Sequence, residues 1–132
     1  MSATKKILII EDSALNRKVL EDALMQRGHE VICAEDGREG IDRLGKESPD
    51  LILMDVVMPN MNGWDACRQM RAVARSQAVP IIIMTSKNTP QDMLQAFEVG
   101  ADEFLEKPIN MEELYAAVDK LLQRDAQPEK PA

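Results

Sequence analysis

Residues 51–55 read Leu-Ile-Leu-Met-Asp, four consecutive apolar residues that end in a carboxylate. Because apolar and polar residues do not alternate in this run, it fits a strand buried on both faces, as in a parallel sheet. Ile7 to Ile10 and Ile81 to Met84 have the same character. Weaker strands are expected at Glu30 to Ala34 and Glu103 to Leu105. The sequence therefore predicts a parallel sheet.

Helical patterns occupy the intervals between these strands. Ser13 is a predicted N-cap, and the helix that it opens is expected to stop near Gly28. A last helix is expected after Asn110, because apolar residues from Met111 to Leu122 recur on one helical face. Shorter helices are expected at Arg38 to Lys46, Trp64 to Ala74 and Gln91 to Val99. Strand and helix thus alternate five times, which predicts an α/β fold with helices on both faces of the sheet.

Length and charge limit the class of protein. A chain of 132 residues fits one domain, which we place at residues 1–124, with residues 125–132 as a flexible polar tail or linker stub. The net charge of −7 argues against direct binding of nucleic acid and against docking on an anionic membrane. No apolar run approaches the length of about 18 residues that a membrane span needs. A cytoplasmic protein without membrane insertion is expected.

Polar residues follow four of the predicted strands at their carboxyl ends. They are Glu11 and Asp12, then Asp55, then Thr85, and finally Lys107. In open α/β sheets, ligands bind beyond these ends, where the strand order reverses. Three carboxylates gathered there would repel one another, and magnesium is the hard cation that such oxygen ligands and a phosphate favour. Asp55 is then a candidate nucleophile toward phosphorus, with Lys107 and Thr85 as donors to the phosphoryl oxygens.

Each of these residues also has an ordinary structural interpretation. Acidic residues after a strand often only cap the next helix. A single aspartate at a strand end is usually a turn residue, and a single lysine is usually solvated. Their coincidence at four strand ends is what favours a functional site.

With these residues assembled, the chain resembles the receiver domain of bacterial two-component response regulators, from about Lys6 to Leu122. Four segments carry the resemblance together: Ile-Glu-Asp at 10–12, Leu-Met-Asp-Val-Val-Met-Pro-Asn-Met-Asn-Gly at 53–63, Met-Thr-Ser at 84–86, and Gly-Ala-Asp-Glu-Phe-Leu-Glu-Lys-Pro at 100–108. The resemblance implies a flavodoxin-like, doubly wound (βα)5 fold with strand order 2-1-3-4-5, for which chemotaxis receivers are themselves the general example.

The resemblance also implies a magnesium-dependent phosphoryl acceptor. Asp55 is expected to accept the phosphoryl group. Asp12 and Asp55 are expected to ligate Mg2+, with Glu11 acting through water and the backbone carbonyl of Val57 completing the protein's share. Lys107 is expected to pair with the phosphoryl group, and no other cofactor is implied.

The resemblance also implies which residues form the switch and which set the lifetime of the phosphoryl group. Thr85 corresponds to the switch hydroxyl, and Phe104 to the aromatic residue that changes rotamer with it. The bond between Lys107 and Pro108 is expected to be cis. Val57 and Lys87, which border the phosphoryl group, are expected to modulate its lifetime.

The function that follows is a phosphorylation-dependent signalling switch and not a metabolic enzyme. A sensor histidine kinase or a histidine phosphotransfer protein would donate the phosphoryl group, docking near Leu15, Pro108 and Ile109, and a downstream target would meet the changed surface. A phosphorylation-dependent homodimer through the fourth and fifth helices stays open. The chain would catalyse only its own phosphorylation and slow dephosphorylation.

Three other functions are compatible with parts of this pattern. A receiver module cut from a longer regulator with an output domain shares the same site. An aspartyl phosphatase usually carries a second acid two residues after the nucleophile, where this chain has Val57. A nucleotide or flavin carrier would need a glycine-rich phosphate loop after the first strand, where Glu11 and Asp12 stand instead.

Overall fold

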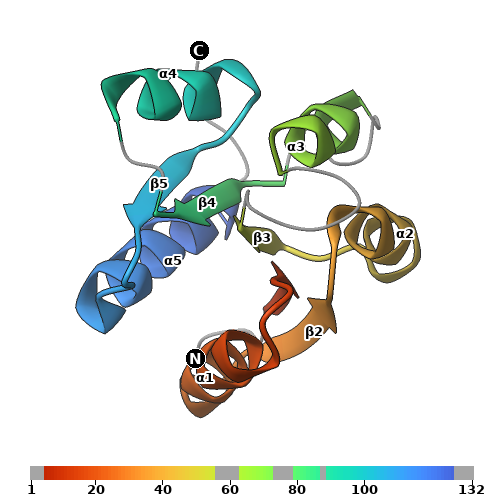
Figure 1. The fold of residues 1–132 in the computed structure, drawn as a ribbon. Helices are drawn as coiled ribbons and strands as arrows, with labels where there is room; N and C mark the ends of the chain where they lie inside the picture. Colours follow the sequence, from red (N-terminus) through yellow and green to blue (C-terminus); the bar gives the residue numbers. More distant parts are fainter. Residues whose placement is uncertain (1–4, 56–62, 73–78, 87–88, 127–132) are drawn as a thin grey trace.

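Strand and helix alternate along the chain in a computed structural model that describes residues 5–55, 63–72, 79–86 and 89–126 (Figure 1). The elements are β1 Lys6–Ile10, α1 Ala14–Gln26, β2 Glu30–Ala34, α2 Gly37–Glu47, β3 Leu51–Asp55, α3 Gly63–Ala72, β4 Ile81–Thr85, α4 Pro90–Glu98, β5 Glu103–Glu106 and α5 Met111–Ala126. Val57 and Lys87 lie outside the described residues, as do residues 127–132 of the predicted tail. Helix α5 continues to Ala126, past the expected domain end at residue 124.

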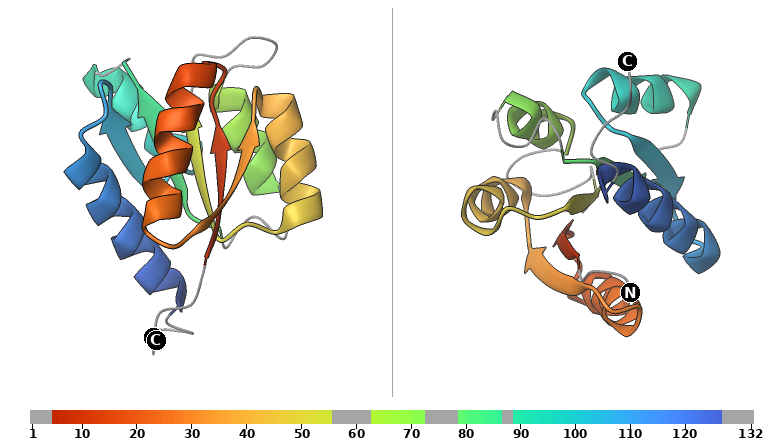
Figure 2. Two further views of the ribbon diagram at one scale, coloured as in Figure 1. Left: turned by 90° about the horizontal axis from the view of Figure 1, so that it is seen from below. Right: turned by 180° about the vertical axis from the view of Figure 1, so that it is seen from behind.

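All strands pair in parallel in the order β2-β1-β3-β4-β5, which confirms the predicted doubly wound fold. Figure 2 shows the strands side by side and running in the same direction. In the register, Ile10 lies opposite Met54, and Asp55 lies opposite Met84. The chain leaves β1 toward one edge of the sheet and β3 toward the other. The carboxyl ends of β1 and β3 are therefore neighbours at the point where the order reverses.

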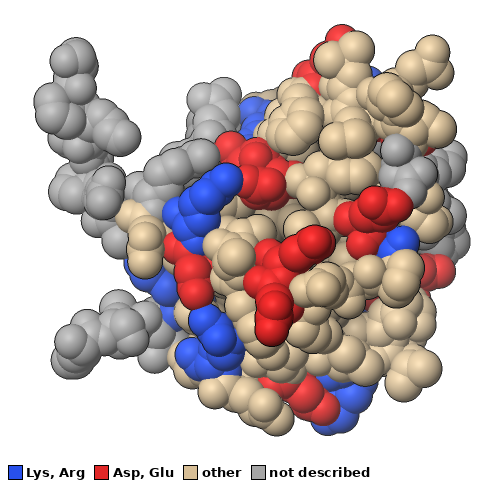
Figure 3. Space-filling model, turned by 90° about the vertical axis from the view of Figure 1, so that its left-hand side faces the viewer, with Lys and Arg blue, Asp and Glu red and all other residues tan. Residues whose placement is uncertain are grey.

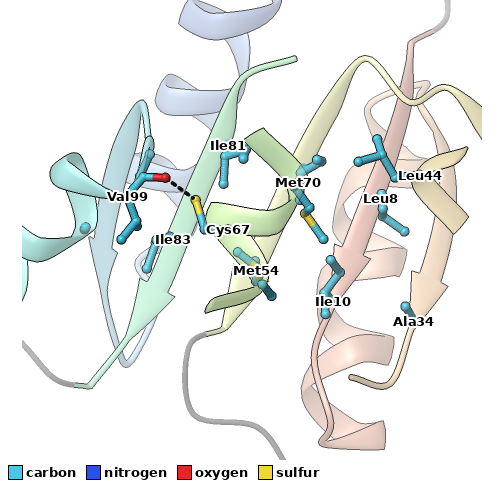
Figure 4. Close-up of a cluster of buried hydrophobic side chains, with 14 residues drawn as sticks. Leu8, Ile10, Ala34, Leu44, Met54, Cys67, Met70, Ile81, Ile83 and Val99 are labelled. Carbon is cyan, nitrogen blue, oxygen red and sulfur yellow. Dashed lines mark hydrogen bonds between the residues drawn. The ribbon is translucent and has the colours of Figure 1, made fainter. Parts of the chain in front are cut away.

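Two helical layers enclose the sheet. Helices α1 and α5 cover one face, and α2, α3 and α4 cover the other (Figures 1 and 2). Every residue of β3 and β4 is buried, as expected for strands covered on both sides. Leu53 belongs to the cluster under α1 and α5, whereas its neighbour Met54 belongs to the cluster under α2 and α3, drawn in Figure 4. Successive residues of each apolar run therefore pack into two hydrophobic cores, one on each face of the sheet.

The predicted helix ends are formed by local hydrogen bonds. Ser13 Oγ accepts from the backbone N–H of Asn16 at 3.2 Å, which satisfies one of the free donors at the start of α1. Asn110 Oδ1 accepts from the N–H of Glu113 at 3.0 Å in the same way at α5. After α1 the chain turns at Gly28, where φ is +91°, a backbone conformation that favours glycine.

Helix α3 is fastened to the turn between α4 and β5. Cys67 Sγ donates to the carbonyl of Val99 at 3.3 Å, the dashed contact in Figure 4. One helical turn later, the Arg71 guanidinium donates twice to the carbonyl of Gly100, at 2.9 and 2.7 Å, and to Asp102 Oδ2 at 2.6 Å. Gly100 itself has a φ of +108°. The turn that leads into β5 is thus held by side chains of a different helix.

Candidate functional site

Three carboxylates meet at the carboxyl ends of β1 and β3. Glu11, Asp12 and Asp55 each offer an oxygen, and these oxygens lie within 4.8 Å of one another. Glu11 is 1% exposed and Asp55 is 5% exposed, whereas Asp12 faces the solvent. Oxygen ligands of this kind, two of them enclosed and one open, fit a hard divalent cation such as Mg2+. The strand order, through the neighbouring ends of β1 and β3, is what brings them together.

Lys107 supplies the positive charge within this cluster. Its ammonium Nζ lies 2.8 Å from Asp55 Oδ2 and 3.1 Å from Glu11 Oε1. Burial alone would lower the pKa of Lys107, but the hydrogen bonds and charges of Asp55 and Glu11 outweigh it and raise the pKa above its ordinary value. The side chain is therefore a stable cation that links the first and third strand ends to the fifth.

Glu11 is held more tightly than its acidic neighbour. Its backbone N–H donates to the carbonyl of Ala34 at 3.1 Å, and its Oε2 accepts from the N–H of Ser13 at 3.1 Å. Its other carboxylate oxygen already accepts from Lys107. Both oxygens of Glu11 thus have protein partners, which leaves Asp12 as the accessible carboxylate of the pair.

The remaining predicted residues belong to β4 and β5. Thr85 is fully buried at the end of β4, and its carbonyl accepts from the backbone N–H of Lys107 at 2.9 Å. Phe104 is partly buried and packs against the cluster on the α2, α3 and α4 face. The peptide bond between Lys107 and Pro108 is cis. The structure thus brings Glu11, Asp12, Asp55 and Lys107 into one site, with Thr85 beside it on the neighbouring strand.

A comparison with known protein families identifies the family of this chain. The family described as the response regulator receiver domain matches residues 7–119. The chain belongs to this family. The match supports a role in phosphorylation-dependent signalling.

Individual relatives of this receiver domain differ in length. The chain is 38% identical to Protein PilH of Pseudomonas aeruginosa over 117 residues, which cover 89% of the chain and 97% of that protein. It is 36% identical to the probable transcriptional regulator ycf27 of Cyanophora paradoxa, over 94% of the chain. The chain spans about half the length of ycf27, 51%, and the same share of the response regulator MprA of Mycolicibacterium vanbaalenii.

The solved structures that resemble this receiver domain support the same fold. The chemotaxis protein CheY4 of Vibrio cholerae superposes with a TM-score of 0.86 at 32% sequence identity. The superposition covers 90% of this chain and 99% of CheY4. The flavodoxin-like arrangement is therefore shared with a structure of clearly related sequence.

A groove lies beside the acidic cluster of the receiver domain. It has a volume of about 510 Å³ and runs between α1 and the segment that follows β5. Of the predicted docking residues, Pro108 and Ile109 line it, whereas Leu15 does not line it but stands 73% exposed on α1. The lining residues are Glu11, Asn16, Val19, Leu20, Met84, Ser86, Lys107, Pro108, Ile109 and Met111.

One residue of the site was missed from the sequence. Arg17 Nη1 donates to the backbone carbonyl of Glu11 at 2.8 Å and lies 3.4 Å from that of Asp12. The sequence did contain an indication that Arg17 has a nearby partner. A cation in the first turn of a helix is unfavourable because of the helix dipole, so a compensating contact is expected. That the partner is a backbone carbonyl could not be predicted, because every residue has one.

The outer surface of the receiver domain agrees with its acidic composition. Figure 3 shows the side on which β5 and α5 lie, and among the described residues visible there, acidic and basic side chains are interspersed. No continuous basic patch forms on that face of the described chain. Within the described ranges, no helix is both long and apolar enough to cross a membrane.

Proposed function

We propose that Asp55 accepts a phosphoryl group from a phosphohistidine donor, in a reaction that requires Mg2+. One observation carries this proposal: the nearly buried carboxylate of Asp55 lies 2.8 Å from Lys107 Nζ and within 4.8 Å of oxygens of Glu11 and Asp12. A nucleophile, a cation and a set of hard oxygen ligands at one sheet edge match what phosphoryl transfer needs.

In the proposed reaction an Asp55 carboxylate oxygen attacks phosphorus and forms the new P–O bond. The P–N bond to the donor imidazole breaks, and the nitrogen keeps the electron pair and takes up a proton. Asp12 and Asp55 would hold the magnesium ion, with Glu11 acting through water and the Val57 carbonyl as a further ligand. When bound, the ion neutralises charge on the carboxylates and on the phosphoryl oxygens. The Lys107 ammonium, 2.8 Å from Asp55 Oδ2, would donate to a phosphoryl oxygen.

The switch is proposed to begin at Thr85 and Lys107. The backbone N–H of Lys107 donates a hydrogen bond to the Thr85 carbonyl. A displacement of either residue toward a phosphoryl group would therefore also shift the other. New charge on Asp55 draws the Thr85 hydroxyl and the ammonium toward it, and Phe104 repacks against its cluster. A downstream target then meets a different surface. Val57 and Lys87 are proposed to set how long the phosphoryl group persists, and pairing through α4 and α5 stays a prediction.

The donor is proposed to dock on α1 and the adjoining groove. Leu15 is expected to insert into the donor, so Leu15→Asp should slow transfer from a histidine phosphotransfer protein about ten-fold or more, because a desolvated apolar anchor is lost. Met25→Asp is the matched control, since Met25 is 54% exposed at the other end of α1. Stopped-flow phosphotransfer measures both variants. Equal rates for Leu15→Asp and the native protein would refute this docking surface.

The proposed chemistry is tested by intact mass after incubation with a small phosphodonor and Mg2+. The expected result is a gain of one phosphoryl group that is lost with a chelator and lost in Asp55→Asn. No gain in the native protein would refute the proposal. The test applies equally to a chain that ends here and to the receiver part of a longer regulator.

A further inference from the structure

Arg17 occupies an unusual place in the first turn of α1. Its side chain is only 19% exposed, and its guanidinium has oxygen partners in two different segments, the end of β1 and the residue after β2. On one side it donates to the carbonyl of Glu11 and approaches that of Asp12, at 2.8 and 3.4 Å. On the other side its Nη2 lies 4.0 Å from a carboxylate oxygen of Glu35, which is 72% exposed.

Helix stability does not explain this position. The amino terminus of a helix carries a partial positive charge, so a cation there is unfavourable. The first turn of α1 contains no acidic residue that would offset Arg17. The distal contact with Glu35 is long and solvent-exposed, and pairs of that kind contribute little. The short bond to the Glu11 carbonyl is therefore the main favourable contact of the guanidinium.

The bond from Arg17 to the Glu11 carbonyl holds the backbone of the segment that carries Glu11 and Asp12. The side chain of Glu11 is already fixed by Ser13 and Lys107. Asp12 is exposed, and Arg17 of α1 approaches its backbone carbonyl at 3.4 Å. Both carbonyls are reached from one nitrogen, Nη1, and a lysine side chain is one atom shorter, so its ammonium would not reach the same point. The 2.8 Å bond engages the carbonyl of the peptide group that joins Glu11 to Asp12, directly before the Asp12 carboxylate.

We infer that Arg17 is a positioning residue for the magnesium site, which holds the Glu11–Asp12 segment so that the Asp12 carboxylate faces Asp55. The inference rests on the proposed function of the acidic cluster. Arg17 has a second, opposing effect, because its positive charge repels a divalent cation. If positioning prevails, loss of Arg17 weakens Mg2+ binding; if repulsion prevails, loss of Arg17 strengthens it.

The test is a Mg2+ titration of the unphosphorylated protein, followed by amide chemical shifts in NMR spectra. Arg17→Ala is expected to weaken Mg2+ binding about ten-fold, the lower end of the effect seen when groups that orient metal ligands are removed. Arg17→Lys keeps the charge on a side chain one atom shorter, which does not reach the Glu11 carbonyl in the same way, and it is expected to weaken binding in the same direction.

Two control variants distinguish a wrong role for Arg17 from a wrong magnesium site. Arg43→Ala removes one positive charge from the surface of α2, where it pairs with Glu39 and Glu47, and should leave Mg2+ affinity within about two-fold. Asp12→Asn should lose most of the affinity; if it does not, the proposed magnesium site itself is wrong. If Asp12→Asn weakens binding while Arg17→Lys binds as tightly as the native protein or more tightly, only the role of Arg17 is overturned.

Discussion

Lys107→Ala is expected to lower the free energy of unfolding by about 3 kcal/mol when divalent cations are absent, because it leaves two enclosed carboxylates without their cation. Glu11 and Asp55 are 1% and 5% exposed, and both lose a short hydrogen bond in this variant. Because the pKa of Lys107 is raised from 10.5 in the folded state, its contribution is fully present at neutral pH. It is lost only as the pH rises through that raised value.

Urea unfolding with a chelator, and again with excess Mg2+, measures this effect. Added Mg2+ should recover more stability in Lys107→Ala than in the native protein, since the ion can replace the missing ammonium among the carboxylates. Lys120→Ala is the control, because Lys120 pairs with Glu103 while 61% exposed and should contribute less than about 1 kcal/mol. Losses of equal size in the two variants would contradict a special role for the enclosed lysine.

Gly100→Ala is expected to destabilise the fold by about 2–3 kcal/mol, for two separate reasons. At a φ of +108° an alanine is strained by about 1–3 kcal/mol. In addition, its Cβ would lie 2.7 Å from Cγ of Arg71, so the arginine would have to move. The displaced guanidinium would lose its bonds to the Gly100 carbonyl and to Asp102.

Thermal and urea unfolding of Gly100→Ala should be compared with Gly45→Ala. Gly45 lies within α2, and a Cβ there would meet nothing within 4 Å. That control is expected to gain about 0.5–1 kcal/mol, because alanine favours the helix. The two substitutions should therefore have opposite signs. A Gly100→Ala protein as stable as the native one would show that the α4–β5 turn tolerates a side chain.

The sheet and the acidic cluster were predictable because they depend on local patterns that combine through topology. The run at 51–55 and its counterparts mark buried strands, and the residue after each strand falls at the same edge. Asp55 and Lys107 could therefore be placed together without knowledge of any side-chain contact. Helix ends were predicted within a residue or two, since caps such as Ser13 and Asn110 act locally.

The supporting contacts could not be predicted in the same way. Arg17 binds carbonyls of the strand end before its helix, and Arg71 binds a carbonyl 29 residues away. The backbone of every residue provides such a carbonyl, whatever its side chain. The partner therefore cannot be recognised from its residue type. The double hydrogen bond of Lys107 likewise depends on the final distance between two strand ends. These contacts follow from the packed geometry alone.

The two separate helical layers have a consequence for how such proteins diversify. Leu15, Val19 and Met25 are exposed apolar residues of α1 on one side of the sheet, whereas Met93, Leu94 and Phe97 of α4 are exposed on the other. Each layer packs on its own core, so substitutions among the exposed residues of one helical layer can alter that surface while the packing of the opposite layer is retained.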